Sequence, residues 1–482
     1  MREIPLALTY DDVLIVPRFS SIKSRRDVDT ATRFTRQIAL KAPFVSANMD
    51  TVTESRMAIA IAESGGIGVV HRFLPIAGQA AEVARVKRHH TDVVEHPFTA
   101  APSLTLGEAM QMMRELDVHG LPVVEQDMKL VGIITRRDIQ LADENALVSE
   151  RMTPVSRMVV ATPNVSLEQA KAMLSERRVE KLPLVDGEGR LVGLITARDL
   201  VRDPSVYTAA RDEQGRLLVA AALGVVGDYL ERAEMVVEAG ADAVVVDISH
   251  GDSAHMLTAV SKLRERLGAT PIVAGNVATA DGTKRLIDAG VDAVKVGVGP
   301  GSMCITREVA GVGVPQFTAV LQSAEVAHKH GVPVIADGGI RKSADVAKAI
   351  AAGASTVMLG NLLAGTDESP GIVIRRDGRK VKIARGMASA EAQHDRAARA
   401  DTEHGWTAFA KDNGHVAAEG IQAPVAYRGA VRDVLADLLA GLRSGMSYCD
   451  AATVEQMWRN AAFVRQTDAG RIESGPHDVG TF

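Results

Sequence analysis

Short runs of small and β-branched residues, each followed by a helix-forming stretch, recur along the chain after residue 215. These runs end in Gly, Asn, Asp or Ser and occupy positions 217–223, 243–248, 271–277, 293–298, 332–336 and 356–359. Because they are almost continuously apolar, they predict strands buried on both faces, as in a parallel sheet. Amphipathic segments such as EVAHKHG and ADVAKAIAAG lie between them, each ended by glycine.

Two more units of the same kind, APFVSANMD and GGIGVV, come before residue 92. About eight β/α units in all predict an α/β fold of the (β/α)8, or TIM-barrel, type. An open, doubly wound sheet is the alternative. Its Rossmann form is disfavoured because no G-x-G-x-x-G motif follows an early strand.

An internal repeat interrupts this pattern in the middle of the chain. The first copy, HGLPVVEQDMKLVGIITRRDI, begins at His119, and the second, EKLPLVDGEGRLVGLITARDL, begins 61 residues later at Glu180. Each copy predicts a helix, two strands joined by a turn, and a helix start at T-x-x-D. The repeat resembles a tandem pair of CBS motifs, a Bateman module, inserted in the barrel. Residues 93–208 would form the pair, divided near 150, and residues 1–92 and 209–482 would form the barrel.

The resemblance to CBS motifs implies that this segment binds ATP or GTP. The candidate ribose contacts are Thr135 and Asp138 in the first copy and Thr196 and Asp199 in the second. A duplicated scaffold without a ligand is the alternative.

Composition excludes several classes of protein. The net charge is −5 and no long Lys/Arg run occurs, so nucleic acid is not an expected partner. Two cysteines among 482 residues rule out a disulfide scaffold and favour a reducing compartment. No apolar run approaches the ~20 residues that cross a bilayer, and the first residues lack a signal-peptide pattern. We expect a cytoplasmic protein with no membrane partner.

One of the cysteines lies in a glycine-rich loop, KVGVGPGSMCITREVAGVGVPQ, which follows a predicted strand. Cys304 would therefore lie at the C-terminal mouth of the barrel, where such enzymes keep their active sites. Arg307 close by would favour the thiolate. We interpret Cys304 as a nucleophile; the alternative is an inert buried thiol.

The loop G-x-G-P-G-S-x-C-x-T-R, followed by G-V-G-x-P-Q, resembles the active-site loop of the IMP dehydrogenase/GMP reductase family. Further motifs match in the same order over most of the chain. They are LTYDDVLIVP, SANMDTVTE, GNVAT, IADGGIRKSAD, MLGNLLAGTDESPG, RGMAS and EGI. An inserted CBS pair is also a habit of this family.

The resemblance implies a purine nucleoside monophosphate substrate, a nicotinamide cofactor and a homotetramer or octamer. Cys304 would attack C2 of the purine, with Thr306 and Glu419 as the other catalytic residues. The nucleotide would contact Ser46, Ser302, Asp337, Gly338, Gly339, Gly360, Asn361, Arg385, Gly386 and Met387. Asp247 and Asn276 would face the nicotinamide ribose, although an Asp at a strand end also caps helices. The carbonyls of Gly299, Gly301 and Cys304 would bind potassium. Gly360-Asn361 departs from the Gly-Ser frequent in the dehydrogenases.

Which of the two reactions takes place depends on the flap expected between Met387 and Tyr427. In IMP dehydrogenases an Arg-Tyr pair in this flap activates water. Here Arg396 and Arg399 are each followed by alanine, and no tyrosine occurs between Tyr229 and Tyr427. This favours an NADPH-dependent GMP reductase. The CBS insertion and the long flap point the other way, to an NAD-dependent IMP dehydrogenase, and a catalytically inactive nucleotide-sensing regulator is a third alternative.

Overall fold

The computed structural model describes residues 4–89, 94, 97–116, 118–140, 142–197, 209–392, 394–395 and 417–476. Two compact units make up the chain. The first comprises Met1–His89 and Ser205–Phe482, and the second is His90–Pro204. The boundaries predicted at 93 and 208 fall outside the described residues, so the inserted CBS pair stays a prediction.

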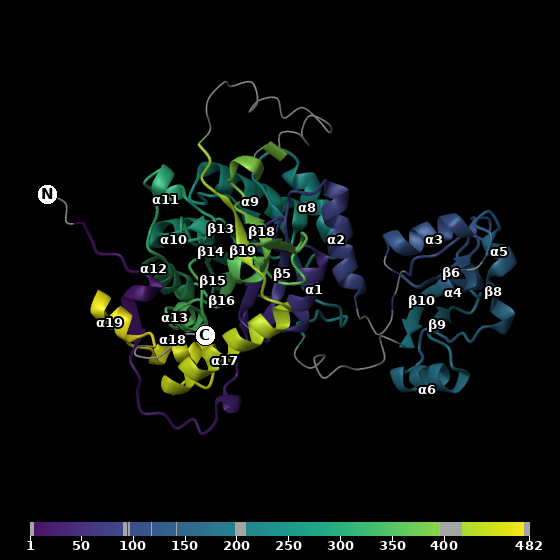
Figure 1. The fold of residues 1–482 in the computed structure, drawn as a ribbon, viewed down its shortest axis with the longest axis horizontal. Helices are drawn as coiled ribbons and strands as arrows, with labels where there is room; N and C mark the ends of the chain where they lie inside the picture. The colour runs from purple at the N-terminus through teal and green to yellow at the C-terminus, as the bar shows by residue number, and fades with distance from the viewer. Residues whose placement is uncertain are drawn as a thin grey trace. The chain divides into compact units, whose positions relative to one another are not determined.

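The first unit contains a closed barrel of eight parallel strands, which confirms the predicted (β/α)8 fold (Figure 1). Around the barrel the order is β11-β12-β13-β14-β15-β16-β4-β5. The strands are β4 (Phe44–Ser46), β5 (Ile67–Val70), β11 (Val219–Leu223), β12 (Ala243–Asp247), β13 (Ile272–Val277), β14 (Ala293–Val296), β15 (Val334–Asp337) and β16 (Thr356–Leu359). Because all run in parallel, their C-terminal residues lie at one end of the barrel.

One long helix follows each strand along the chain. These helices are α1 (Ser55–Glu63), α2 (Ile76–Arg88), α8 (Tyr229–Glu238), α9 (Ala254–Leu267), α10 (Ala280–Asp288), α12 (Gln316–Lys329), α13 (Ser343–Ala351) and α17 (Val431–Tyr448). Side-chain caps start two of them. Ser253 accepts from the N–H of Met256, and Thr279 accepts from that of Gly282. Such caps satisfy backbone donors that the first helical turn leaves unpaired.

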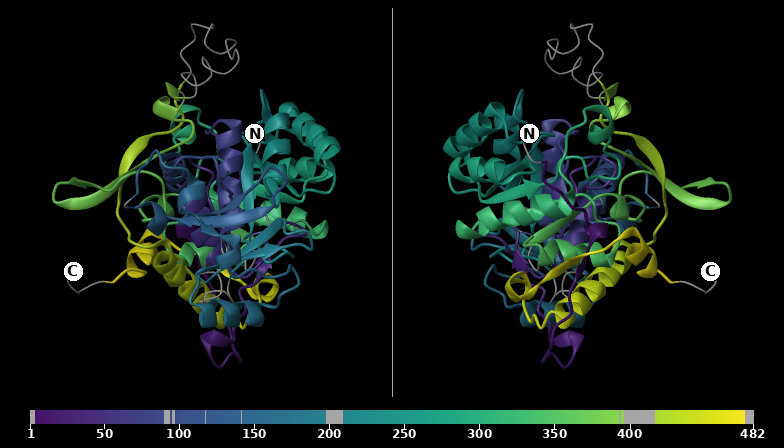
Figure 2. Two further views of the ribbon diagram at one scale, coloured as in Figure 1. Left: turned by 90° about the vertical axis from the view of Figure 1, so that its right-hand side faces the viewer. Right: turned by 90° about the vertical axis from the view of Figure 1, so that its left-hand side faces the viewer.

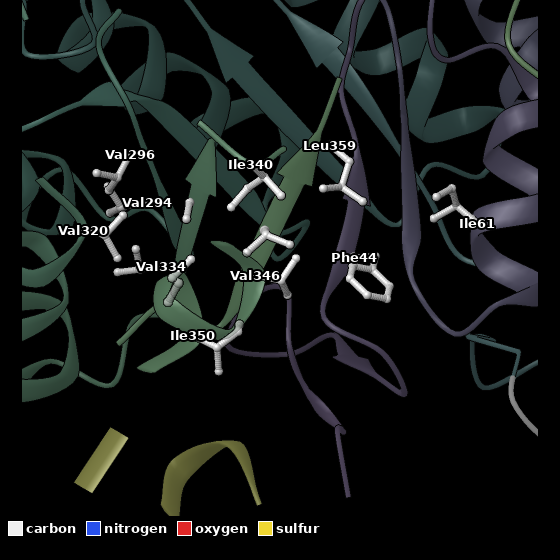
Figure 3. Close-up of a cluster of buried hydrophobic side chains, with 14 of the residues drawn as sticks. Phe44, Ile61, Val294, Val296, Val320, Val334, Ile340, Val346, Ile350 and Leu359 are labelled. Carbon is white, nitrogen blue, oxygen red and sulfur yellow. The ribbon is translucent and has the colours of Figure 1, made fainter. Parts of the chain in front are cut away.

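The barrel core has two layers, and this explains why the strands read as continuous apolar runs. Along β11, Val219, Ala221 and Leu223 pack in the layer that also contains the helices, shown in part in Figure 3. Ala220 and Ala222 belong to a second cluster, built mostly from strand residues and without helix residues, which fills the barrel. Successive side chains of a strand point to opposite faces, so both sets are apolar.

Shorter elements surround the barrel in the first unit. The helical ones are η1 (Tyr10–Asp12), η2 (Arg25–Asp27), α11 (Thr306–Val309), α14 (Asn361–Ala364), α18 (Val454–Asn460) and α19 (Asp468–Glu473). The strands are β1 (Val13–Ile15), β2 (Thr32–Arg33), β3 (Ala39–Leu40), β17 (Ile374–Arg376), β18 (Arg379–Arg385), β19 (Gln422–Ala426) and β20 (Phe463–Arg465). Strands β17, β18 and β19 form an antiparallel sheet, and Figure 2 shows its β17–β18 hairpin extending away from the barrel.

The second unit consists of two similar halves. The first half holds α3 (Leu106–Glu115), β6 (Gly120–Val124), β7 (Leu130–Thr135), α4 (Arg136–Ile139), α5 (Val148–Arg151), β8 (Thr153–Pro154) and η3 (Val155–Arg157). The second half holds α6 (Leu167–Arg177), β9 (Lys181–Val185) and β10 (Leu191–Thr196). The turns of the two hairpins bond to each other, from Leu130 N to Gly189 O at 3.0 Å and from Leu191 N to Met128 O at 2.8 Å. Each half has its own small core.

A search of the described residues finds no helix that is both long and apolar enough to cross a membrane.

Candidate active site

Side chains predicted for ligand binding converge at the C-terminal end of the barrel strands. Asp247 is the last residue of β12, Asn276 lies near the end of β13, and Asp337 ends β15. The Nδ2 atom of Asn276 donates to Asp337 Oδ2 at 2.9 Å and to the carbonyl of Gly297 at 2.6 Å. The Oδ1 atom of Asn276 is buried and has no partner among the described residues.

A buried lysine that the sequence analysis did not single out joins these carboxylates. Lys295, in β14, places its Nζ 2.5 Å from Asp337 Oδ2 and 3.1 Å from Asp247 Oδ1. Burial alone would raise the pKa of Asp247. The charge of Lys295 and the hydrogen bond from Asn48, at 2.6 Å, outweigh burial and lower that pKa. The sequence feature that could have pointed to Lys295 is the presence of a lysine within the apolar run AVKV.

The predicted catalytic residues Cys304, Thr306 and Glu419 lie in a continuous row. The Sγ atom of Cys304 is 3.2 Å from Thr306 Oγ1, and Thr306 Oγ1 is 2.8 Å from Glu419 Oε2. Backbone pairing aligns the two segments. Ile305 N donates to Glu419 O at 2.8 Å, and Ile421 N donates to Met303 O at 3.0 Å. A thiol, a hydroxyl and a carboxyl in contact form a path along which protons can move.

Two glycines allow this close pairing. A Cβ atom on Gly386 would lie 2.6 Å from the carbonyl oxygen of Met303, and one on Gly420 would lie 2.9 Å from Ser389 N. Gly386 N donates to Ile421 O at 2.9 Å. The segment after β18, the segment around Glu419 and the cysteine loop therefore meet through their backbones.

The guanidinium of Arg385, predicted to contact the nucleotide, bonds to acidic side chains. Its Nε atom donates to Asp50 Oδ2 at 2.9 Å, and its Nη1 atom donates to Asp395 Oδ2 at 2.7 Å. The neighbouring Met387 accepts at Sδ from Asp50 N at 3.4 Å. Ser46 is fully buried at the end of β4, its hydroxyl 2.9 Å from that of Thr53. These contacts fix the positions of the Arg385, Met387 and Ser46 side chains.

A cavity of about 320 Å³ lies beside the cysteine loop and is lined by Ser302, Met303, Asn361, Arg428 and residues of β19. Ser302 and Asn361 were predicted to bind phosphate; Arg428 was not singled out. The Oδ1 atom of Asn361 is buried without a partner among the described residues. A volume near 300 Å³ is at the lower end for small-molecule sites.

The other predicted phosphate residues form tight turns at the ends of β15 and β16. Gly338 and Gly339 follow Asp337 with φ of +95° and +81°, which favour glycine. A Cβ atom on Gly338 would lie 2.8 Å from Pro300, and one on Gly360 would lie 3.3 Å from the sulfur of Met49. The turn at Gly338 brings the backbone close to the cysteine loop.

The guanidinium of Arg307 bonds to the two ends of the cysteine loop. Its Nη2 atom donates to Val298 O at 3.3 Å and to Val314 O at 2.6 Å. Within this loop Gly299 has φ of +84°, and Gly301 O accepts from Cys304 N at 3.0 Å. The expected potassium site at these carbonyls stays a prediction.

In the second unit, Thr135 and Asp138 bond to each other. The carboxylate of Asp138 accepts from the Thr135 hydroxyl at 2.6 Å and from its N–H at 2.8 Å. Asp138 also lines a cavity of about 250 Å³ with Arg137, Ala142 and Arg151. Thr196 ends β10. Asp199, and the flap residues Arg396 and Arg399, lie outside the described residues.

Comparison with known proteins identifies the family of this chain. Residues 7–477 match the model of the IMP dehydrogenase / GMP reductase domain. The chain therefore belongs to the IMP dehydrogenase/GMP reductase family and is an oxidoreductase of that family, which uses nicotinamide cofactors.

Relatives carry both names. The chain is 48% identical to the inosine-5'-monophosphate dehydrogenase of Nitrosopumilus maritimus over 477 residues, or 99% of each chain. The Aquifex aeolicus protein of the same name is 46% identical over 481 residues, 99% of this chain and 96% of its own. A structure of a cysteine-to-alanine variant of Trypanosoma brucei GMP reductase with guanosine 5'-monophosphate has a TM-score of 0.90 and 47% identity, covering 99% of each chain. A structure of Trypanosoma brucei GMP reductase with guanosine 5'-triphosphate has a TM-score of 0.79 and 43% identity, covering 96% of this chain and 98% of its own.

Proposed function

We propose that this chain is a cytosolic GMP reductase, which converts GMP and NADPH into IMP, ammonia and NADP⁺. The observation that carries the proposal is the flap sequence. Residues 388–418 contain no tyrosine, so the Arg-Tyr pair used to activate water has no counterpart there. The row of Cys304, Thr306 and Glu419 supplies what the reductase needs instead, a proton donor beside the leaving amino group.

The contacts among the catalytic residues support the following roles. The sulfur of Cys304 forms a bond to C2 of the purine. Glu419, through the Thr306 hydroxyl, delivers the proton with which the C2 amino group leaves as ammonia. When bound, the reduced nicotinamide supplies the hydride that C2 receives. The C2–sulfur bond then breaks, which releases IMP and restores the Cys304 thiolate.

The chain offers matching groups for both ligands. The carboxylate of Asp337 would accept from the substrate ribose, and the backbone of Gly338, Gly339 and Gly360, with Ser302 and Asn361, would bind the phosphate. Met387 and Glu419 would contact the base. For the nicotinamide ribose, Asp247 and Asn276 fit, because the buried Oδ1 atom of Asn276 lacks a partner among the described residues and can accept from a hydroxyl.

The second candidate is an IMP dehydrogenase that uses NAD⁺. The names of relatives at 48% and 46% identity favour it. A catalytically inactive regulator is a weaker candidate, because such a protein has no need of a thiol in contact with its proton-transfer partners.

Absorbance at 340 nm separates the three candidates. One cuvette contains purified protein, GMP and NADPH; the other contains protein, IMP, NAD⁺ and K⁺. We expect absorbance to fall in the first with release of ammonia. A rise in the second would establish the dehydrogenase, and no change in either, with ATP or GTP added, would indicate the regulator.

We propose further that the second unit is a CBS pair that binds ATP or GTP and that the enzyme assembles as a tetramer or octamer. Support comes from the repeat and from the cavity in which Arg137 and Arg151 offer positive charge to phosphates. Binding should alter turnover or melting temperature. Unchanged kinetics and melting with both nucleotides would contradict the first proposal, and a monomer in light scattering the second.

A further inference from the structure

Among the described residues, Lys295 is the one that forms an ion pair with both Asp247 and Asp337, and its side chain is 1% exposed. It occupies an apolar barrel strand, where a lysine is rarely buried without a partner. Space for it is left by Gly275 on β13, because a Cβ atom there would lie 2.6 Å from the Cβ atom of Lys295. The fold therefore accommodates an ammonium group between the ends of β12 and β15.

The donors around Asp337 and Asp247 bond to particular oxygens of each carboxylate. On Asp337, the ammonium of Lys295 and the amide of Asn276 both bond to Oδ2. No donor among the described residues bonds to its Oδ1 atom, which leaves that oxygen for a ligand. On Asp247, Lys295 contacts Oδ1 and Asn48 bonds to Oδ2. One ammonium with three donors thus serves two carboxylates.

The charges explain why one cation matters to both acids. Two carboxylates within reach of the same nitrogen repel each other, and without Lys295 this repulsion favours uptake of a proton. The charge of Arg72 also lowers the pKa of Asp247 and remains in place without Lys295. A protonated carboxyl donates rather than accepts at one oxygen, and a ribose hydroxyl would lose its acceptor. Burial works against the charge of Lys295, but Asp247 and Asp337 outweigh it and raise the lysine's pKa.

We propose that Lys295 is a positioning residue that bridges the Asp247 and Asp337 carboxylates and offsets their repulsion, so that binding of the purine nucleotide and of the nicotinamide nucleotide depends on the same cation. The inference rests on the proposed function in assigning Asp337 to the substrate ribose and Asp247 to the cofactor ribose. Lys295 itself is 1% exposed, so it would act on both ligands through the two carboxylates.

The test measures binding by titration calorimetry in a Cys304→Ala background, which prevents turnover. The probes are GMP and IMP for one site and NADPH and NAD⁺ for the other. Lys295→Met should weaken binding of the preferred ligand of each pair by about tenfold or more. Asp247→Asn should weaken only the nicotinamide nucleotide.

The double variant Lys295→Met/Asp247→Asn distinguishes a shared charge from a structural defect. With one carboxylate left there is no repulsion between the two. The affinity for the purine nucleotide should therefore return to within about threefold of the affinity of the Asp247→Asn variant. A merely structural lysine would give no such recovery. If Lys295→Met does not fold, the double variant and Asp247→Asn still provide this comparison.

An effect of Lys295→Met on one ligand only, or no recovery in the double variant, would overturn the proposal. Failure of the reductase assignment would look different. In that case the unmodified enzyme would oxidise IMP, and the same binding pattern would be measured with IMP and NAD⁺.

Discussion

Among single residues, Thr306 occupies the position on which the proposed chemistry depends. Its hydroxyl has one proton and lies between the Cys304 sulfur and the Glu419 carboxylate, at 3.2 and 2.8 Å. It can donate to one and accept from the other, so a proton can pass in either direction.

Thr306→Val should therefore lower kcat by about 10²- to 10⁴-fold, the usual contribution of a positioned acid or base. Thr306→Ser, which keeps the hydroxyl, should retain most of the activity.

Glu419→Gln should slow release of ammonia more than hydride transfer, as followed by single-turnover assays of both products. Unchanged ammonia release in Glu419→Gln would contradict the assignment of its carboxylate.

The two cysteines offer an internal comparison of thiol reactivity. Cys304 is partly exposed, whereas Cys449 is fully buried and burial raises the pKa of its thiol. Limited iodoacetamide should modify Cys304 alone, GMP should slow that modification, and Cys304→Ala should abolish turnover. Mass spectrometry of the digested protein would detect this. Modification of Cys449 first, or no protection by GMP, would speak against a nucleotide bound at Cys304.

At the scale of elements, one buried lysine of the first unit joins the two chain segments that flank the second unit. Lys87, in the last turn of α2, contacts Asp212 Oδ2 at 3.0 Å and Asp242 Oδ2 at 2.7 Å. Asp242 comes just before β12 and accepts from Val219 N of β11 at 2.8 Å. Burial raises the pKa of Asp242, whereas Lys87 lowers that of Asp212 against the effect of burial.

Lys87→Met should destabilise the protein by about 3–5 kcal/mol, because it leaves the buried carboxylate of Asp242 without its cation, whereas Asp212 keeps its pair with Arg216 at 2.9 Å. Urea unfolding of the first unit measures this. Lys284→Met is the matched control, since its pair with Asp288 is about half exposed and contributes less than about 1 kcal/mol. Equal losses in both variants would mean that burial of the Lys87 cluster has no energetic consequence.

At the scale of the whole molecule, the two units have separate hydrophobic cores. The barrel clusters contain only residues of the first unit, and the clusters around Leu121 and Leu182 contain only residues of the second. Separate cores are the usual sign of domains able to fold alone.

Replacement of residues 90–208 by a short linker should therefore leave a folded barrel with most of its turnover. Any effect of ATP or GTP on activity or melting should disappear, because the Arg137 cavity is removed. Circular dichroism and steady-state kinetics on both proteins provide the comparison. An unfolded or inactive barrel would show that the second unit is needed for more than regulation.

Much of the site could be anticipated from the chain because its signals are local. Continuous apolar runs require strands covered on both sides, and the residues that end them must then meet at one mouth of a barrel. Asp247, Asn276, Asp337 and the Cys304 loop are all placed by this rule. It does not tell which of them are in contact.

Contacts between distant segments were decided by tertiary structure. The 2.8 Å bond between Thr306 and Glu419, 113 positions apart, depends on backbone pairing that no periodicity encodes. The same holds for Lys295, which pairs with two carboxylates on other strands, and for Arg385, which pairs with Asp50. The alternation of side chains along a strand is a property of a few neighbouring residues. The partner of a buried charge is chosen by packing, because only the folded barrel removes water from it and makes one particular counterion necessary.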